Sequence, residues 1–440
     1  MLYLLGVLAI ALGVALSIAL HELGHLVPAK RFGIKCTQYM IGFGPTIWSR
    51  RVGETEYGLK AIPLGGYVRM LGMFPPKPGQ AARADTTGRW GLLIEQARDD
   101  AQRDISPQDG DRLFYQRSVP KRIVVMMGGP LMNLVLAVVL LTMLVSVFGI
   151  KRETTLTLEK VSACVIPADA PVGRTCLPSD PRAPGAAAGL RPGDTVVSFA
   201  GKPLSSWEEI RTAIRANPGR SVPMEVDRAG SRLSLTVTPV VDRRPVLGGD
   251  GQARRGADGK LVLEPVGFLG LEPRDVRVTE PVSAVPAVVG NALARTAGVV
   301  LRIPEKMVGV AQAAFAGGER DVEGPSSVVG VARFGGEIAS LDSETVGDKL
   351  VGLLGLLAAL NLALFVFNMI PLLPLDGGHI AGALWEGLRR QVARMRDRPD
   401  PGPVDVARAL PVAYAVASVL LVMSVLLIYA DLVNPIRLIG

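Results

Sequence analysis

Four long segments of the chain contain no charged residue, and they constrain the fold more than any other feature of the sequence. They are residues 1–20, 123–150, 350–375 and 409–430. Each is long enough to cross the hydrocarbon core of a bilayer as a helix, which takes about 20 apolar residues. The sequence therefore predicts a polytopic α-helical membrane protein with about four transmembrane helices.

The first segment is expected to remain in the protein as a spanning helix, residues 1–32. No basic residue precedes its apolar run and no small-residue cleavage site follows it, which is not the form of a signal peptide. Lys30 and Arg31 end this span, and six arginines lie between the last two spans, in residues 380–408. Since basic flanks mark cytoplasmic loops, we expect both chain termini and residues 151–349 to be extracytoplasmic.

The charge of the chain gives no reason to expect nucleic acid as a partner. The formal net charge is +8, but the basic residues are dispersed and do not alternate with aromatic residues in a stripe. The lipid bilayer is the partner that the sequence predicts.

The largest polar block contains local signals for a small α+β domain, residues 151–275. Residues 195–199 are strand-like, and Ser206 with Glu209 forms a capping box that opens a helix. Two alternating runs then flank a turn at residues 229–230. Preceded by the run A-G-L-R-P-G-D, this order resembles a bacterial PDZ domain, which binds extended peptides by strand addition. We therefore predict one inserted extracytoplasmic PDZ domain.

The rest of the outer block, residues 276–349, is predicted to be a linker with one amphipathic helix. Residues 284–315 are apolar-rich but carry several charged side chains, Arg295 and Arg302 among them, and this density favours a helix on the membrane surface. A fifth span is the alternative, although it would place the arginine-rich loop outside. The predicted regions are span 1 (1–32), a cytoplasmic loop (33–122), span 2 (123–150), the PDZ domain (151–275), the linker (276–349), span 3 (350–379), a cytoplasmic loop (380–408) and span 4 (409–430).

The first cytoplasmic loop contains two glycine-interrupted runs, residues 41–45 and 57–68, which we expect to be membrane-associated strands. They form either an ordinary hairpin or an edge strand beside a functional site. Residues 74–117 are rich in Pro, Gly, Asp and Arg, and we expect a mostly flexible loop with one short helix near residues 92–101.

Two of the three cysteines, Cys164 and Cys176, lie in the outer block. An oxidising compartment would allow a disulfide between them. Cys36 is expected to be cytoplasmic and reduced. The spacing of Cys164 and Cys176 is not typical of a zinc site.

The motif H-E-x-x-H closes the first span, with His21, Glu22 and His25. Residues four apart lie on one face of a helix, so the two imidazoles can bind one metal ion. Zinc accepts imidazole ligands, and a catalytic zinc site has three protein ligands with a fourth position open. Glu22 stands where a metalloprotease has its general base.

Two histidines are too few for zinc, and the candidate for the third ligand is Asp376. It lies at the end of span 3, which we expect to run inward and so to reach the level of His21 and His25. Two prolines precede it, and broken helix is tolerated at membrane depth only where it lines a cavity. Zinc chemistry alone would also accept His379, and in another interpretation Asp376 only caps the following helix.

The second span opens with Gly128 and Gly129, followed by Asn133. Small residues allow helices to pack closely within a membrane, and an intramembrane asparagine can donate a hydrogen bond to a neighbouring helix. Taken alone, Asn133 is best explained as such a structural contact.

Together these motifs resemble the site-2 protease family of intramembrane zinc metalloproteases, in its bacterial sigma-E-regulating form with a single PDZ domain. The resemblance rests on H-E-L-G-H in span 1, G-F-G after it, G-P-x-x-N in span 2 and N-x-x-P-x-x-P-L-D-G-G-H in span 3. It implies Zn²⁺ as the cofactor. Its ligands would be His21, His25 and Asp376, with Glu22 as general base and with Asn133 and Asn368 positioning the substrate.

The resemblance also implies a reaction and a place for it. The expected function is regulated intramembrane proteolysis in the bacterial inner membrane. Its substrates would be single-pass membrane proteins such as anti-sigma factors, cut first by an extracytoplasmic protease. A transmembrane helix must unwind before its peptide bonds can be cut, and the freed backbone groups then need partners. An edge strand near residues 42–44 or 57–62 could supply them.

Two other functions remain open at this point. One is a membrane-anchored PDZ receptor or scaffold with a structural zinc site, but a structural site has no need of the base Glu22. The other is a metallopeptidase for soluble extracytoplasmic peptides, which the cytoplasmic level of the histidines disfavours.

Overall fold

The computed structural model describes residues 1–75, 96, 103, 105–152, 155–167, 170, 174–246, 254, 262–316, 320–321, 324–341 and 344–436. The chain divides into two compact units, of which unit 1 comprises Met1–Leu144 and Val282–Ile436, and unit 2 contains Val145–Pro281. The short helix predicted near residues 92–101 lies outside the described residues, except for Gln96.

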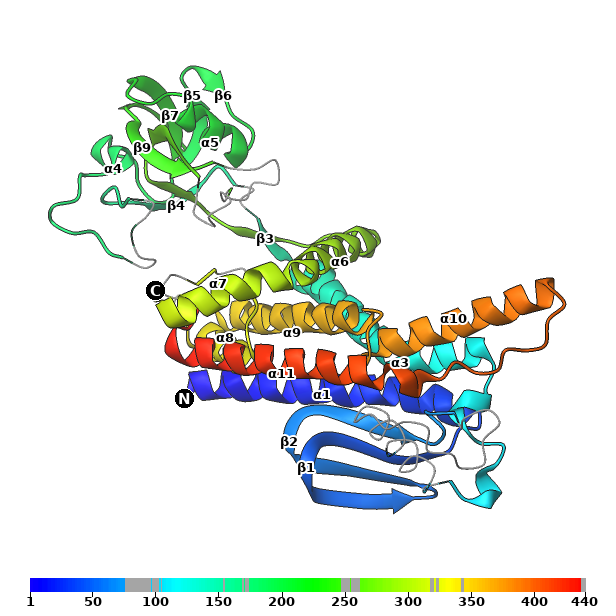
Figure 1. The fold of residues 1–440 in the computed structure, drawn as a ribbon. Coiled ribbons are helices and arrows are strands. Elements are labelled where there is room, and N and C mark those ends of the chain that lie inside the picture. The colour runs from blue at the N-terminus through cyan, green and yellow to red at the C-terminus, as the bar shows by residue number, and fades with distance from the viewer. Residues whose placement is uncertain are drawn as a thin grey trace. The chain divides into compact units, whose positions relative to one another are not determined.

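Unit 1 is built from helices and one sheet (Figure 1). Its helices are α1 (Leu2–Arg31), α3 (Val119–Thr142), α6 (Val285–Leu301), α7 (Ile303–Ala316), α8 (Val328–Ser340), α9 (Val346–Asn368), α10 (Asp376–Met395) and α11 (Leu410–Val433). Short 3-10 turns lie at Pro107–Asp109 (η1), Phe114–Gln116 (η2), Val282–Ala284 (η4) and Val406–Ala409 (η5), and a π-helical segment, Met143–Phe148 (η3), extends α3.

Among the described residues, five helical segments are long and apolar enough to cross a membrane. Four correspond to the predicted spans, and the fifth is Val282–Leu301. The sequence favoured a single surface helix over 284–315, but the structure has two helices there, α6 and α7, which meet at Arg302. The first of them meets the length and hydropathy that a span needs.

The third predicted span is also divided. Helix α9 ends at Asn368, and α10 begins at Asp376 after a non-helical segment that contains both prolines. The predicted break is therefore confirmed. The following loop, predicted over 380–408, is helical as far as Met395.

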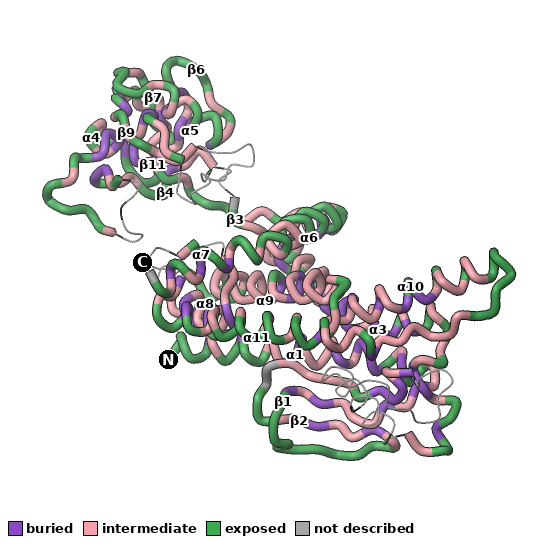
Figure 2. Tube along the Cα trace, viewed as in Figure 1, coloured by how far each residue is buried: buried purple, intermediate pink, exposed green. Residues whose placement is uncertain are grey.

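Helix α1 lies against α3, α8 and α9 (Figure 1). The contact with α8 is made by glycines, since a Cβ built on Gly6 would lie 2.2 Å from the backbone oxygen of Gly335. Large apolar side chains remain exposed on the outer helices, among them Leu421 and Val422 of α11 (Figure 2). An apolar surface of this kind suits contact with lipid rather than water.

The sheet of unit 1 contains β1 (Cys36–Val52) and β2 (Thr55–Met70), which together make four antiparallel segments. Residues 36–41 pair with residues 56–59 on one side and with 66–70 on the other, while residues 46–52 pair with 55–60. The segment 57–62, predicted as a possible edge strand, is therefore paired on both sides for much of its length. Among the described residues, the edge that adjoins α1 is formed by 66–70.

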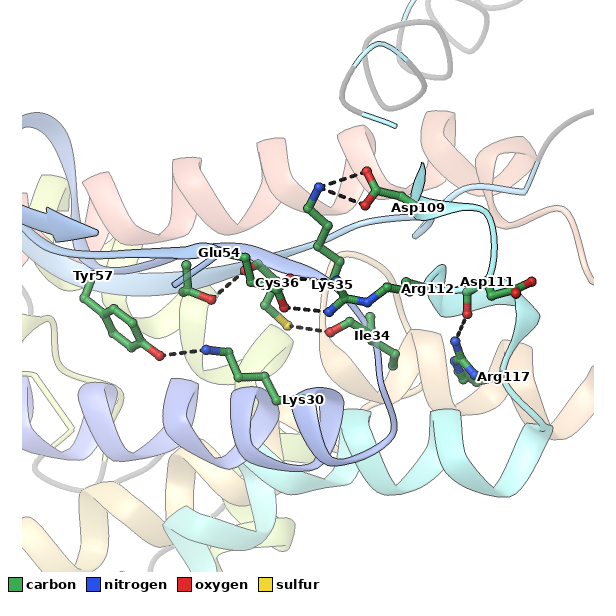
Figure 3. Close-up of polar contacts among 11 residues, drawn as sticks. Lys30, Ile34, Lys35, Cys36, Glu54, Tyr57, Asp109, Asp111, Arg112 and Arg117 are labelled. Atoms are coloured by element: carbon green, nitrogen blue, oxygen red, sulfur yellow. Dashed lines mark hydrogen bonds and ion pairs between the residues drawn. The ribbon is translucent and has the colours of Figure 1, made fainter. Parts of the chain in front are cut away.

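Charged contacts hold this sheet to the segment that precedes α3 (Figure 3). Lys35 Nζ lies 2.8 Å from an Asp109 carboxylate oxygen, and Arg112 makes two hydrogen bonds of 2.7 Å to Glu54. Hydrogen bonds from Lys35 and then Ser106 lower the pKa of Asp109 to about 2. Beside them Cys36 is a free thiol, as predicted, and burial raises its pKa to about 12.

Unit 2 is mainly β-structure with two short helices, α4 (Pro184–Ala187) and α5 (Trp207–Arg215). Strands β6, β5, β7 and β8 form its main sheet in that order, and the pairs β3–β12, β4–β11 and β9–β10 accompany it. The strands are β3 (Ile150–Arg152), β4 (Leu158–Val161), β5 (Thr195–Phe199), β6 (Lys202–Pro203), β7 (Val222–Arg228), β8 (Ser231–Val237), β9 (Val240–Pro245), β10 (Leu263–Phe268), β11 (Leu271–Pro273) and β12 (Val276–Val278).

The local signals read from the sequence of unit 2 are confirmed. Strand β5 covers 195–199, Ser206 accepts a hydrogen bond from the backbone of Glu209 at the start of α5, and β7 and β8 meet at the turn 229–230. Apolar side chains of the sheet and of α5 form one buried core. Its largest members are Leu158, Phe199, Trp207, Ile210, Met224 and Leu269.

Two covalent or ionic contacts reinforce unit 2. Cys164 and Cys176 form a disulfide, as predicted. Asp194, the last residue of the A-G-L-R-P-G-D run, is buried and accepts hydrogen bonds of 2.7 and 2.8 Å from Arg228. Burial acts to raise the pKa of Asp194, but the hydrogen bonds from Arg228 and from the backbone of Arg191 outweigh it and hold the pKa below its usual value.

Candidate metal centre

Three of the predicted site residues come together inside unit 1. His21 and His25 lie one turn apart on α1, and their Nε2 atoms are 3.2 Å from each other. The Oδ2 atom of Asp376 lies 3.4 Å from each of these nitrogens. Within the described residues, this is the group of His, Cys, Asp and Glu side chains that could hold a metal ion.

The spacing of the three donor atoms fits zinc. Tetrahedral zinc with bonds of 2.0–2.2 Å places neighbouring ligand atoms about 3.3 Å apart. The three observed separations, 3.2, 3.4 and 3.4 Å, match such an edge. Two imidazole nitrogens and one carboxylate oxygen are also a donor set of catalytic zinc sites, which leave a fourth position open.

Asp376 reaches the histidines because the chain is broken just before it. Residues 369–375 are not helical, and Asp376 is the first residue of α10. A Cβ on Gly377 would lie 2.3 Å from the backbone oxygen of Ile370, and one on Gly378 would lie 2.6 Å from the nitrogen of Leu373. The two glycines thus allow α10 to begin directly against the broken segment, which sets the direction of the carboxylate.

Two alternatives were open for this end of α10: Asp376 could cap the helix, or His379 could be the third ligand. Neither receives support. No side-chain hydrogen bond caps the helix, so Asp376 does not serve as its N-cap. His379 is not part of the metal-binding group and instead lines a small pocket that also contains Arg122 and Glu386. Arg122 and Glu386 form a buried ion pair, which joins α3 to α10.

Helix α3 lies directly over the histidines. A Cβ on Gly129 would lie 2.1 Å from His25 Nε2, and one on Gly128 would lie 1.9 Å from the backbone oxygen of Gly24. The close packing predicted for these small residues is therefore confirmed. It allows His25 Nδ1 to donate a hydrogen bond of 2.8 Å to the backbone oxygen of Val125.

Asn133, one turn farther along α3, is buried and lies with its Nδ2 atom 3.2 Å from His21 Nδ1. The cross-helix contact expected of it is present, and its partner is a candidate metal ligand. Asn368 is the last residue of α9, and its side chain makes no hydrogen bond to the described part of the chain.

Glu22 lies on α1 beside the sheet, with only 9% of its surface exposed. A Cβ on Gly66 would lie 2.8 Å from Glu22 Cγ, so the edge segment 66–70 passes directly over this side chain. The Glu22 carboxylate has no hydrogen-bond partner among the described residues. It is thus available to accept a proton.

Two neighbours of the site were not revealed by the sequence: Val125, which contacts His25, and Gly66, which lies against Glu22. Val125 acts through its backbone oxygen, which no side-chain pattern encodes. Gly66 belongs to a pair of adjacent glycines, and that pair was the available signal for a close approach.

Comparisons with known proteins agree with this geometry. The pattern of peptidase family M50 matches residues 9–398. The chain is 35% identical to zinc metalloprotease Rip1 of Mycobacterium tuberculosis, over 100% of both chains. It is 32% identical to Rip1 of Mycolicibacterium smegmatis, also over 100% of both chains. It is 26% identical to zinc metalloprotease RasP of Geobacillus kaustophilus, over 84% of this chain and 86% of that one.

The chain belongs to peptidase family M50. Family M50 contains the site-2 proteases, so the chain is a multi-pass membrane protein and a zinc metalloprotease of the site-2 type. This membership confirms the resemblance and the zinc cofactor predicted from the sequence. It argues against a PDZ receptor or scaffold that lacks proteolytic activity.

Proposed function

We propose that this site-2 protease performs regulated intramembrane proteolysis, with His21, His25 and Asp376 as zinc ligands and Glu22 as general base. The observation that carries the proposal is the convergence of two Nε2 atoms and one carboxylate oxygen at tetrahedral spacing beside Glu22, which is buried and has no hydrogen-bond partner in the described part of the chain. The spacing supports the ligand set, and the burial supports a site shielded from bulk water.

The role of each side chain follows from its position. Bound zinc supplies the Lewis acidity that polarises a scissile carbonyl. Glu22 takes a proton from the attacking water and delivers it to the departing amide nitrogen. His21, His25 and Asp376 would hold the metal ion close to the break between α9 and α10.

The substrate is a single-pass membrane protein whose helix unwinds beside α1. Its freed backbone groups need hydrogen-bond partners, because lipid offers none. The edge segment 66–70 passes over Glu22 and is suited to accept such a chain by strand addition. Asn368 and Asn133 are assigned to position the substrate at the break between α9 and α10 and at the histidines, respectively.

Unit 2 is assigned as a PDZ domain that lies outside the cytoplasm. Its strand, helix and hairpin follow the A-G-L-R-P-G-D run, and the disulfide between Cys164 and Cys176 is typical of an oxidising compartment. There it would act as a filter that admits substrates already trimmed by another protease, as expected for an anti-sigma factor.

The topology is open to a direct test. With the sheet and α10 on the cytoplasmic side of the inner membrane, reporter fusions at residues 95 and 395 read as cytoplasmic. A fusion at residue 215 reads as extracytoplasmic. Both chain termini lie outside, which requires that Val282–Leu301 lies on the membrane surface and does not cross it. A cytoplasmic signal at residue 215 would contradict the assignment of unit 2.

The activity is tested by co-expressing a transmembrane peptide with the protease and following its cleavage. Replacing Glu22 by Gln keeps the side chain volume but removes the base, and general-base catalysis contributes about 10²–10⁴-fold to such rates. We expect Glu22→Gln to lose cleavage by this factor while keeping its zinc. Undiminished cleavage by Glu22→Gln would reject the mechanism.

A further inference from the structure

Helix α3 places a polar group beside Nδ1 of each histidine of the metal centre. His25 Nδ1 lies 2.8 Å from the backbone oxygen of Val125, and His21 Nδ1 lies 3.2 Å from the amide of Asn133. Both Nε2 atoms lie 3.4 Å from Asp376 Oδ2, on the side of the metal centre. The two contacts differ in the α3 group that faces Nδ1, which is a carbonyl oxygen at His25 and an amide nitrogen at His21.

The contact with Val125 determines where His25 carries its proton. A backbone carbonyl can only accept a hydrogen bond, so Nδ1 of His25 is protonated. In the neutral ring, Nε2 then has a free lone pair, which is the form of imidazole that binds a metal. Histidine ligands of metals usually donate their other ring N–H to an oxygen in this way.

His21 needs the same arrangement if it binds the same ion. Its Nε2 must offer a lone pair, so its proton must reside on Nδ1 and face an acceptor. With Nδ2 of Asn133 facing it, however, Nδ1 of His21 meets a donor. Oδ1 of Asn133, meanwhile, is buried without a hydrogen-bond partner in the described residues.

One rotation of the Asn133 amide resolves the mismatch at His21. The oxygen and nitrogen of a carboxamide have nearly the same shape, and the hydrogen-bond network decides which occupies which position. After a rotation of 180°, Oδ1 faces His21 Nδ1 and accepts its N–H. The amide nitrogen then takes the buried position that has no partner among the described residues.

We propose that Asn133 is a positioning residue of the metal centre, whose amide oxygen accepts the Nδ1–H of His21 and so directs Nε2 to the zinc. Its role parallels that of the Val125 carbonyl at His25. The inference rests on the proposed ligand set and adds to it a group outside the three ligands. It leaves the amide nitrogen free for the substrate contact assigned above.

Substitutions at Asn133 can show whether His21 Nδ1 needs a hydrogen-bond acceptor or a donor at this position. Asp keeps an oxygen at the required place and has no N–H, whereas Leu has a similar volume and neither group. A matched control is Asn361 of α9, which is equally buried, hydrogen-bonds to Ser17 of α1 and also has an unpartnered Oδ1. Asn361→Leu thus removes a buried asparagine that touches α1 without touching a histidine.

The experiment measures the zinc affinity of the purified full-length protein by competition with a chelator. Groups that orient metal ligands typically contribute 10–100-fold to affinity. We expect Asn133→Leu to bind zinc about 10–100-fold more weakly, while Asn133→Asp and Asn361→Leu stay within about threefold of the unmodified protein.

Three results would overturn the inference. They are unchanged affinity in Asn133→Leu, equal weakening in Asn133→Asp and Asn133→Leu, and equal weakening in Asn361→Leu and Asn133→Leu. His21→Ala is measured alongside and tests the proposed ligand set separately. If His21→Ala loses zinc while Asn133→Leu keeps it, the ligand assignment stands and the role of Asn133 falls.

Discussion

The two units of the molecule differ in where their buried polar side chains lie. Unit 2 has an apolar core with Phe199, Trp207 and Met224 at its centre. Unit 1 also has an apolar core, which includes Val125 and Met126, and beside it lie buried polar groups, among them His25 and Asn133. Burial of apolar surface stabilises a fold, whereas a buried polar group costs free energy unless it is hydrogen-bonded. The buried polar groups of unit 1 include those at the candidate metal centre, whereas Asp194 of unit 2 forms an ion pair that reinforces its fold.

This difference predicts opposite sensitivities to substitution. Where Gly24 of α1 meets Gly128 of α3, the two backbones touch without side chains between them, so an added carbon atom should disturb the packing there. In unit 2 the core is filled by large side chains, so removing carbon atoms from one of them should destabilise the unit. Experiments on the full-length protein that follow zinc binding and hydrogen exchange of each unit can separate the two.

The largest effect is expected at Gly129. The added Cβ of Gly129→Ala would lie 2.1 Å from His25 Nε2, where no atom can remain, so the ring or the helix must move. We expect zinc affinity to fall at least 100-fold, beyond the range for groups that only orient a ligand. Hydrogen exchange in unit 2 should stay unchanged.

Gly298 of α6 provides the matched control, because a Cβ there would meet no atom within 4 Å. Gly298→Ala should bind zinc like the unmodified protein. Equal zinc affinity in Gly129→Ala and Gly298→Ala would contradict the close packing of α3 on His25.

The converse substitution is Phe199→Ala in unit 2. Phe199 is 1% exposed, and removal of a buried phenylalanine side chain typically costs about 3–5 kcal/mol. Hydrogen exchange in unit 2 should accelerate accordingly, while zinc affinity stays the same. A loss of zinc in this variant would show that the two units are not independent in the way described.

A smaller effect is expected from the disulfide. Replacing Cys164 and Cys176 by serine opens a short closed loop, and a bridge of this length contributes roughly 3 kcal/mol at most. Exchange should increase in unit 2 alone. Thiol labelling of the unreduced, denatured protein should find one reactive thiol, Cys36, and three would contradict the bridge.

The smallest effect is expected on the stability of unit 2 at acidic pH. Because Asp194 has a lowered pKa in the folded protein, its ion pair with Arg228 stabilises unit 2 fully above the pKa of the unfolded chain, about 3.9. This stabilisation is lost as the pH falls below that value toward the folded pKa. The stability of unit 2 in Asp194→Asn should change less between pH 6 and pH 3, roughly the window set by these pKa values. An identical acid dependence in both proteins would exclude this contribution.

The sequence predicted β5, α5, β7 and β8 of unit 2 and the three-residue cluster of unit 1. Alternation and turn residues describe strands such as β5 and the turn at 229–230 because these are local features. His21 and His25 share a helix face by spacing alone. Asp376 was placed with them by its chemistry, by the expected direction of its span and by the resemblance to the site-2 protease family.

Other features lie beyond what residue patterns encode. The edge strand beside the site was expected near 42–44 or 57–62, but strand order depends on long-range pairing, and 66–70 holds that place. The carbonyl of Val125 is a backbone group without a sequence signal. Residues 380–408 were expected to be a loop because they connect two spans, but α10 extends to Met395, and its buried Glu386 pairs with Arg122 of α3.

The zinc content of three purified variants tests the account most directly. Asp376→Ala should lose the metal, because it removes one of three donors. His379→Ala should keep the metal and some activity, because His379 lies outside the donor group. Glu22→Ala should keep the metal and lose proteolysis, because it removes only the base. A zinc-free His379→Ala protein beside a loaded and active Asp376→Ala protein would contradict the assignment of the metal centre.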